Sequence, residues 1–276
     1  MTDTDPYTLP PPNVRQMVVP DPGYVLVEAD LARADAQVCA WDANCRELKE
    51  VFQRGDDIHS DNARWLYGKD INPRALHVNG MSFRDNAKRA VHLSDYAGGG
   101  WILAQSCSLP RAKADSFVDW WTRREHPAIG EWHDNISREL QRRKNPVAYN
   151  AFGFRRIYTD RTDRLLGQVL AWICQSTVSI VINKAMKQVD CAEDIFGRPR
   201  CGSCLKCRVP WFHLLLQVHD SLLLQVEESY VEEVARALPE AMRVTVPYPD
   251  PLVIPSEVKW SPHNWARMEK WQQPAI

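Results

Sequence analysis

The sequence predicts an α+β fold, in which an antiparallel sheet is built from strands far apart in the chain and a helical subdomain is inserted between them. The centre of this prediction is residues 214–226, where two copies of Leu-Leu-Leu-Gln-Val flank His219-Asp220-Ser221. Each copy is long enough for a strand but too short for an independent helix. Two such runs around a short polar segment predict a β-hairpin whose tight turn holds Asp220 at the rim of the sheet. An ordinary solvated turn is the alternative.

Two further strands are expected at the start and end of the chain. An apolar run from Tyr24 ends in Asp30, and residues 31–41 then show a helical pattern. Asp30 therefore stands at the end of a strand and next to a helix, where the alternative role for an aspartate is a helix N-cap. Residues 252–260 predict a closing strand.

Composition limits the class of protein. The chain has 276 residues, of which 45% are hydrophobic, enough for a core in one or two domains. Its net charge of −1 argues against general coating of nucleic acid but allows a local basic groove. We identify no apolar run approaching a membrane span and no signal peptide, and therefore expect no membrane partner and a cytoplasmic location.

Residues 82–100 predict a helix with an unusual polar face. Ser82, three residues before Asp85, resembles a capping box, and a glycine run ends the pattern. Side chains four residues apart drift by only about 40° per step on a helix, so they share one face. The members of this stripe are Arg84, Lys88, His92 and Tyr96. Two cations, an imidazole and a phenol suit a polyphosphate that carries a flat base, and a solvated basic face is the alternative.

Two smaller features also call for explanation. Gln175-Ser-Thr177 interrupts a predicted apolar helix over residues 166–186, and either a ligand or helix packing explains such a polar patch. Four cysteines cluster before the hairpin: Cys191, Cys201, Cys204 and Cys207. Their spacing fits a structural Zn²⁺ site, an iron–sulfur cluster, or thiols without a metal.

Three of these motifs together resemble family A DNA polymerases, in particular the phage and mitochondrial branches. Asp30-Leu-Ala-Arg-Ala-Asp35 is similar to the first palm motif, and the stripe that begins at Arg84 is similar to the finger helix. Gln217-Val-His-Asp-Ser221 is similar to the last palm motif. The Arg-Asp-Asn-Ala-Lys start of the finger helix is typical of the phage branch, and the resemblance extends over roughly residues 12–270.

The resemblance implies template-directed DNA synthesis. Nucleotidyl transfer uses two carboxylates that hold two divalent cations about 3.5–4 Å apart. Asp30 and Asp220 are the expected Mg²⁺ ligands, with the backbone carbonyl of Leu31 as a third. The other residues expected to bind the dNTP are Arg84, Lys88, His92, Tyr96, Asp35 and His59. Gln175 and His219 are expected at the primer terminus.

The resemblance also implies a domain plan and partners. The expected segments are an extended arm (1–17), palm (18–48), fingers (49–168) and palm (169–276), the last including a Cys-rich insertion (191–207) and the catalytic hairpin (214–226). Primer-template DNA and dNTPs are the expected ligands. A second polypeptide or a missing segment would supply the thumb, and a phage-encoded chain would act in the host cytoplasm.

Several positions depart from the family pattern, among them the following three. His92 stands where the family has Phe or Tyr, Asp35 is one methylene shorter than the family's Glu, and Ser221 replaces a third acidic residue. There are two alternative functions: a catalytically silent DNA-binding or replisome module, and a two-metal phosphodiesterase. The intact charges disfavour the first, and the triphosphate-matching helix face disfavours the second.

Overall fold

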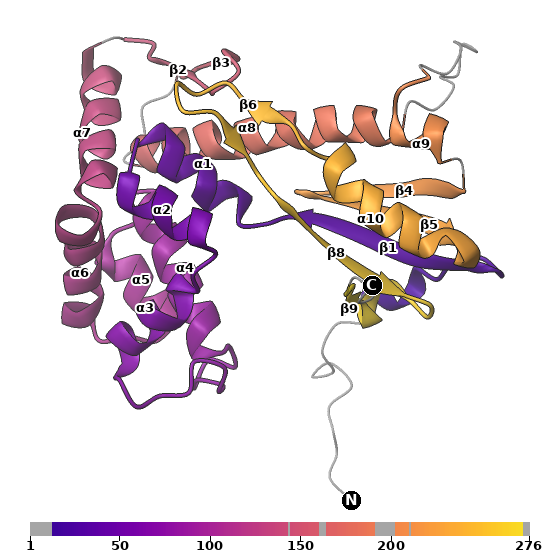
Figure 1. The fold of residues 1–276 in the computed structure, drawn as a ribbon. Helices are drawn as coiled ribbons and strands as arrows, with labels where there is room; N and C mark the ends of the chain where they lie inside the picture. Colours follow the sequence, from indigo (N-terminus) through magenta and orange to yellow (C-terminus); the bar gives the residue numbers. More distant parts are fainter. Residues whose placement is uncertain (1–12, 143, 160–163, 191–201, 210, 273–276) are drawn as a thin grey trace, which may run out of the picture. The chain divides into compact units, whose positions relative to one another are not determined.

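The chain folds into two compact units, described here one at a time. The computed structural model describes residues 13–142, 144–159, 164–190, 202–209 and 211–272 (Figure 1). The first, here called the sheet unit, comprises Met1–Ala32, Val181–Val244 and Ile254–Ile276. The second, the helical unit, comprises Arg33–Ile180 and Thr245–Val253. Assigning the two units to palm and fingers remains a prediction.

The sheet unit is built on a five-stranded sheet in the order β4-β5-β1-β8-β9, with every neighbouring pair antiparallel. Its strands are β1 (Tyr24–Leu31), β4 (Phe212–Val218), β5 (Ser221–Glu227), β8 (Ser256–Ser261) and β9 (Glu269–Lys270). The expected α+β class with an antiparallel sheet is therefore confirmed. The central strand β1 pairs with β5, which lies about two hundred residues further along the sequence.

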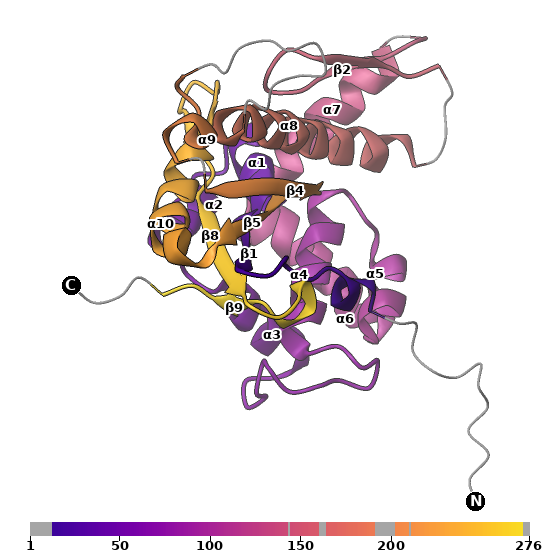
Figure 2. The same ribbon diagram turned by 90° about the vertical axis from the view of Figure 1, so that its right-hand side faces the viewer.

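The sheet is packed on both sides of β1. Helix α10 (Val231–Ala241) contacts β1, β5 and β8, and Figures 1 and 2 show it lying along the sheet. Leu26 on β1 and Leu223 on β5 pack with Trp265 of the short 3₁₀ helix η5 (Trp265–Arg267). Since side chains alternate along a strand, Glu28 and Asp30 lie on the same face as Leu26.

The predicted hairpin is present, with His219 and Asp220 as its two-residue turn between β4 and β5. Its two identical halves differ in environment. The copy in β5 is almost entirely buried, whereas β4 is an edge strand on which Leu215 and Leu216 are 36% and 39% exposed. A register shift lies between Leu214 and Leu216. The two identical runs therefore differ in exposure because β5 lies inside the sheet and β4 lies at its edge.

The expected closing strand at 252–260 is in fact two strands. The pair β6 (Thr245–Val246) and β7 (Leu252–Val253) belongs to the helical unit, and β8 belongs to the sheet. Pro255 lies between β7 and β8; it has no N–H to offer a ladder, and its carbonyl accepts from the Ala32 N–H at 2.8 Å.

The helical unit consists mainly of consecutive helices. They are α1 (Ala34–Asp42), α2 (Arg46–Arg54), α3 (Ile58–Tyr67), α4 (Phe83–Asp95), α5 (Gly100–Cys107), α6 (Arg111–Asp119) and α7 (Pro127–Arg142). A π-helical stretch, η3 (Trp120–Glu125), separates α6 from α7. Phe117, Trp121 and Ile129 are fully buried in the core of this unit. A short hairpin of β2 (Val147–Tyr149) and β3 (Arg155–Ile157) follows α7.

Helix α8 (Leu165–Val189) begins in the helical unit and ends in the sheet unit. By length and composition it could cross a membrane, so the expectation that no such segment exists is wrong. Half of its most apolar window is buried within the protein, as in the core helix of a globular fold.

At the N-terminus, residues 1–12 of the predicted arm lie outside the described residues. The following segment forms a 3₁₀ helix, η2 (Val14–Met17), where extended chain was expected. Asn13 caps it by accepting from the Arg15 N–H at 3.1 Å, a local bond that favours a turn over an extended backbone.

Candidate active site

Asp30 and Asp220 lie together in the sheet unit. Asp30 is opposite Ser221 in the β1–β5 register, and Asp220 precedes Ser221 in the turn. The Leu31 N–H donates to the Asp220 carbonyl at 3.0 Å, which ties the turn to the end of β1. Asp30 is not a helix N-cap, because α1 begins later and its N-cap is Arg33. Two carboxyls almost two hundred residues apart in sequence thus share one corner of the sheet.

The two carboxyls interact electrostatically. Burial raises the pKa of Asp30 from 3.8 to about 6, and the charge of Asp220 and a hydrogen bond between the two side chains also raise it. Lys259 on β8 acts in the opposite direction. Repulsion between two neighbouring negative charges favours a proton on Asp30 as the pH falls toward 6.

The pair fits a divalent cation by the chemistry of its donors. Hard cations prefer carboxylate and carbonyl oxygens, and a bound cation would offset the repulsion between the two carboxylates. Among the described residues no three His, Cys, Asp or Glu side chains are grouped to hold a metal. A site here would therefore depend on Asp30, Asp220 and backbone oxygen, with Leu31, the last residue of β1, as the predicted carbonyl donor.

His219 is exposed at the turn and has a left-handed backbone, with φ of 53°. That conformation costs a non-glycine residue about 1–2 kcal/mol. Gln217 stabilises the turn by donating from Nε2 to the His219 carbonyl at 2.7 Å. A strained backbone and an exposed side chain, one residue before Asp220, make His219 a candidate functional residue.

In the helical unit, α4 displays most of the predicted stripe. Ser82 caps the helix by accepting from the Asp85 N–H at 3.0 Å, as its sequence indicates. The helix ends at Asp95, so Tyr96 is its C-cap and not part of the helical face as expected. Tyr96 is half-buried, and the groups that raise the pKa of its phenol, after burial itself, include Cys174 and Asp35. Asp35 lies in the first turn of α1.

Arg84 has a partner that the sequence analysis did not identify. Its guanidinium donates to Asp57 from Nε at 3.0 Å and from Nη2 at 2.9 Å. The bonds to Arg84 hold the pKa of Asp57 well below its usual range. Because they use one edge of the guanidinium, a phosphate would approach the Nη1 edge. The sequence places Asp57 two residues before His59, but no spacing rule predicts that Asp57 pairs with Arg84.

His59 and His92 lie close to the cations of this stripe. The pKa of His59 falls to about 4, first through burial and then through the charges of Arg84, His92 and Lys88. Burial, with Lys88, lowers the pKa of His92 to about 4. Both imidazoles are therefore neutral at pH 7. His59 is 4% exposed, and its Nδ1 has no hydrogen-bond partner within the described part of the chain.

The polar patch on α8 has a structural explanation for two of its three residues. Ser176 accepts from Asn150 Nδ2 at 3.0 Å, and Thr177 accepts from the Ala151 N–H at 3.3 Å. Gln175 is exposed and remains the member suited to a ligand. Asn150, absent from the predicted site, holds the β2–β3 loop by accepting from the Phe152 and Phe154 N–H groups at 3.1 and 3.0 Å.

Half of the cysteine cluster can be described. Cys204 and Cys207, at either end of the first turn of α9 (Leu205–Arg208), have their sulfurs 3.4 Å apart. Cys191 and Cys201 lie outside the described residues. A zinc site here remains a prediction.

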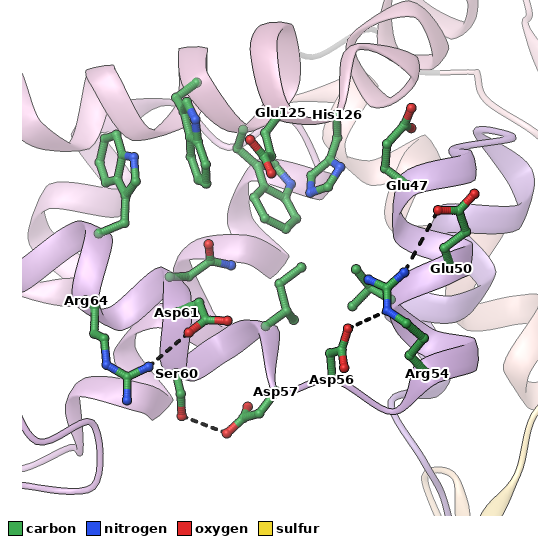
Figure 3. Close-up of a pocket in the computed structure, with 16 residues that line it drawn as sticks. Glu47, Glu50, Arg54, Asp56, Asp57, Ser60, Asp61, Arg64, Glu125 and His126 are labelled. Carbon is green, nitrogen blue, oxygen red and sulfur yellow. Dashed lines mark hydrogen bonds and ion pairs between the residues drawn. The ribbon is translucent and has the colours of Figure 1, made fainter. Parts of the chain in front are cut away.

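A cavity of about 860 Å³ in the helical unit does not suit a nucleotide (Figure 3). Its carboxylates are Glu47, Glu50, Asp56, Asp57, Asp61 and Glu125. Two of its arginines are already paired, Arg54 with Asp56 and Arg64 with Asp61, as the dashed lines in Figure 3 show. The lining would repel a triphosphate, so the cations of α4 are the better candidate.

Comparisons with known proteins agree with these observations. The sequence matches DNA polymerase family A over residues 10–267. The thermostable DNA polymerase I of Thermus thermophilus is 27% identical over 246 residues, which are 89% of this chain and 27% of that protein. The DNA polymerase I of Chloroflexus aurantiacus is 29% identical over 266 residues, 92% of this chain and 25% of that protein. The chain thus spans about a quarter of the length of these relatives.

A solved structure supports the fold. The POL domain of Pol1 from M. smegmatis, in complex with DNA primer-template and dNTP, matches with a TM-score of 0.67 at 22% identity, over 91% of this chain and 42% of that one. The expected similarity to the phage and mitochondrial branches has no support here, because bacterial DNA polymerase I proteins dominate among the relatives. The match over nearly the whole chain shows that this protein belongs to family A of the DNA polymerases.

Proposed function

We propose that this chain carries out template-directed DNA synthesis, adding a nucleotide from a dNTP to a primer 3′-hydroxyl. The observation that supports this most directly is the adjacency of Asp30 and Asp220 in a family A chain. The M. smegmatis relative, solved with primer-template and dNTP, supports the same ligands for this chain. DNA synthesis is also the function named for the curated relatives.

The chain's own residues would divide the work as follows. Asp30 and Asp220 would hold two divalent cations, Mg²⁺ by expectation, with the Leu31 carbonyl as a further donor. When bound, such ions lower the pKa of the attacking hydroxyl and offset charge on the transferring phosphate. His219 and Gln175 would contact the primer terminus.

The helical unit would bind the nucleotide. Arg84 and Lys88 would offset the charge of the triphosphate, with His59 beside them. Neutral His92 would present a flat ring to the base, with Tyr96 and Asp35 near the sugar or the templating position. Pairing with Asp57 would keep the guanidinium of Arg84 oriented while its other edge binds phosphate.

Primer extension tests the proposal. Labelled primer-template, dNTPs and Mg²⁺ should give extended products with the native chain and at least about a thousandfold less with Asp220→Asn, because a removed metal ligand acts mainly on the transition state. Glu233→Gln, an exposed position on α10, serves as the matched control. DNA binding without extension by the native chain would favour the silent DNA-binding module.

The thumb remains part of the proposal. We expect a second polypeptide or a further segment to supply it, and extension should rise when such a partner is added. If the native chain extends the primer poorly and the added partner restores extension, the metal site is active and the thumb was what limited synthesis.

A further inference from the structure

Strand β1 contains a buried carboxyl that no step above uses. Glu28 is two residues before Asp30, so both side chains lie on the same face of the sheet. Glu28 is 5% exposed. Its position matters because Ser221, across from Asp30, stands where the family motif has an acidic residue. The hairpin therefore lacks one carboxylate, and the neighbouring strand has one.

Glu28 forms a hydrogen bond with Ser221, the residue that stands where the family has an acidic side chain. Its Oε1 accepts from the Ser221 hydroxyl at 3.2 Å and from the Trp265 indole N–H at 3.0 Å. The indole can only donate, so it fixes the carboxyl oxygen as an acceptor. The Ser221 hydroxyl also lies 3.1 Å from the Val218 carbonyl, and its single proton can serve one acceptor at a time.

The two hydrogen bonds to Glu28 do not by themselves explain why a charged side chain stands at this position. A glutamine at position 28 could accept from the same two donors, and a buried carboxylate is far more costly than a buried amide. Lys259 stands opposite Glu28 in the β1–β8 register and offers one source of compensation. A divalent cation at Asp30 and Asp220 would offer a second.

We propose that Glu28 is a positioning carboxylate of the metal site, which supplies from β1 the negative charge that the family places on the hairpin. It does not ligate the ion but acts through the Ser221 hydroxyl and through its field on the aspartate pair. This inference rests on the proposed function. It predicts that charge at position 28 strengthens cation binding, and that the charge can be moved back to position 221.

The test measures Mn²⁺ binding to the full chain, without DNA or nucleotide, by isothermal titration or by the EPR signal of unbound Mn²⁺. Glu28→Gln should weaken Mn²⁺ binding about tenfold, as loss of an outer-shell partner does. The double variant Glu28→Gln/Ser221→Glu should recover to within about twofold of the native chain. Glu233→Gln, which removes one exposed carboxylate of the same unit, should leave the affinity unchanged.

Two further variants separate a structural role from an electrostatic one. Trp265→Phe removes the indole donor but keeps the carboxylate, so its Mn²⁺ affinity should stay within about twofold of native. If Glu28 served only to anchor Trp265, this variant would lose as much affinity as Glu28→Gln. Ser221→Ala, a small change suited to a chain in which Glu28→Gln does not fold, should weaken binding a fewfold.

Asp220→Asn separates this inference from the proposed function. Loss of Mn²⁺ binding in Asp220→Asn with full binding in Glu28→Gln would overturn the role of Glu28 and leave the metal pair standing. Unchanged binding in Asp220→Asn would overturn the metal pair itself. A double variant that fails to recover would also reject the exchange of carboxylates between strands.

Discussion

Replacing Asp30 by Asn should stabilise the metal-free protein at neutral pH. Burial and Asp220 raise the pKa of Asp30 from 3.8 to about 6 in the folded protein, while the unfolded chain keeps a value of about 3.9. Between about pH 4 and pH 6 the folded state therefore binds more protons than the unfolded state, so the free energy of unfolding falls as pH rises. Asparagine does not titrate and removes this loss.

The magnitude follows from the pKa. A change from 3.8 to about 6 corresponds to about 3 kcal/mol at about 1.36 kcal/mol per pKa unit. Asp30 is only half-buried, and solvent screening reduces the expected effect to about 1–2 kcal/mol. From pH 4.5 to pH 7 the native chain should lose about 1–2 kcal/mol more than Asp30→Asn does. Other titrating groups cancel in this comparison.

Urea unfolding without metal, at pH 4.5 and pH 7, provides the measurement. Adding Mg²⁺ at pH 7 should restore the native chain and leave Asp30→Asn unaffected, because a bound cation removes the repulsion that opposes ionisation. Glu233→Gln should titrate like the native chain. An identical pH dependence in the native chain and Asp30→Asn would refute the reasoning, since it would mean that neither burial nor Asp220 raises the pKa of Asp30.

Three other predictions concern separate parts of the chain. His92→Tyr should increase dNTP affinity in primer extension if position 92 is a stacking surface, and unchanged kinetics would remove that role. Asn150→Ala should lower the free energy of unfolding by about 2 kcal/mol, measured by thermal or urea melts, because the Phe152 and Phe154 N–H groups lose their acceptor. The purified chain should contain zinc by elemental analysis and lose it in Cys204→Ser; a native chain without zinc would argue for unliganded thiols or an iron–sulfur cluster.

Local sequence was sufficient for elements whose causes are local. The capping serine and the four-residue spacing of α4 predict its helix, and the polar interruption at 219–220 predicts the hairpin. Each depends on residues within a few positions of one another. The end of α4 at Asp95 was missed, since the four-residue spacing continues to Tyr96 although the backbone does not.

Environments set by distant segments could not be predicted in this way. Identical Leu-Leu-Leu-Gln-Val runs become a buried strand and an edge strand because β1, from the other end of the chain, pairs with β5 and not with β4. The ion pair of Arg84 with Asp57 and the bond from Ser221 to Glu28 likewise join residues that no periodicity relates. Polar partners of this kind depend on tertiary packing.

The register of β1 against β5 is what connects sequence to chemistry here. With Asp30 opposite Ser221, Leu26 and Leu223 lie on one face and pack with Trp265, and Glu28 and Asp30 share that face. A slip by one residue would turn Asp30 toward the other face and place Leu26 away from its cluster, so apolar burial selects the register. The same pairing brings the turn, and with it Asp220, to the end of β1. The hydrophobic contacts of this sheet thus determine where its carboxylates meet.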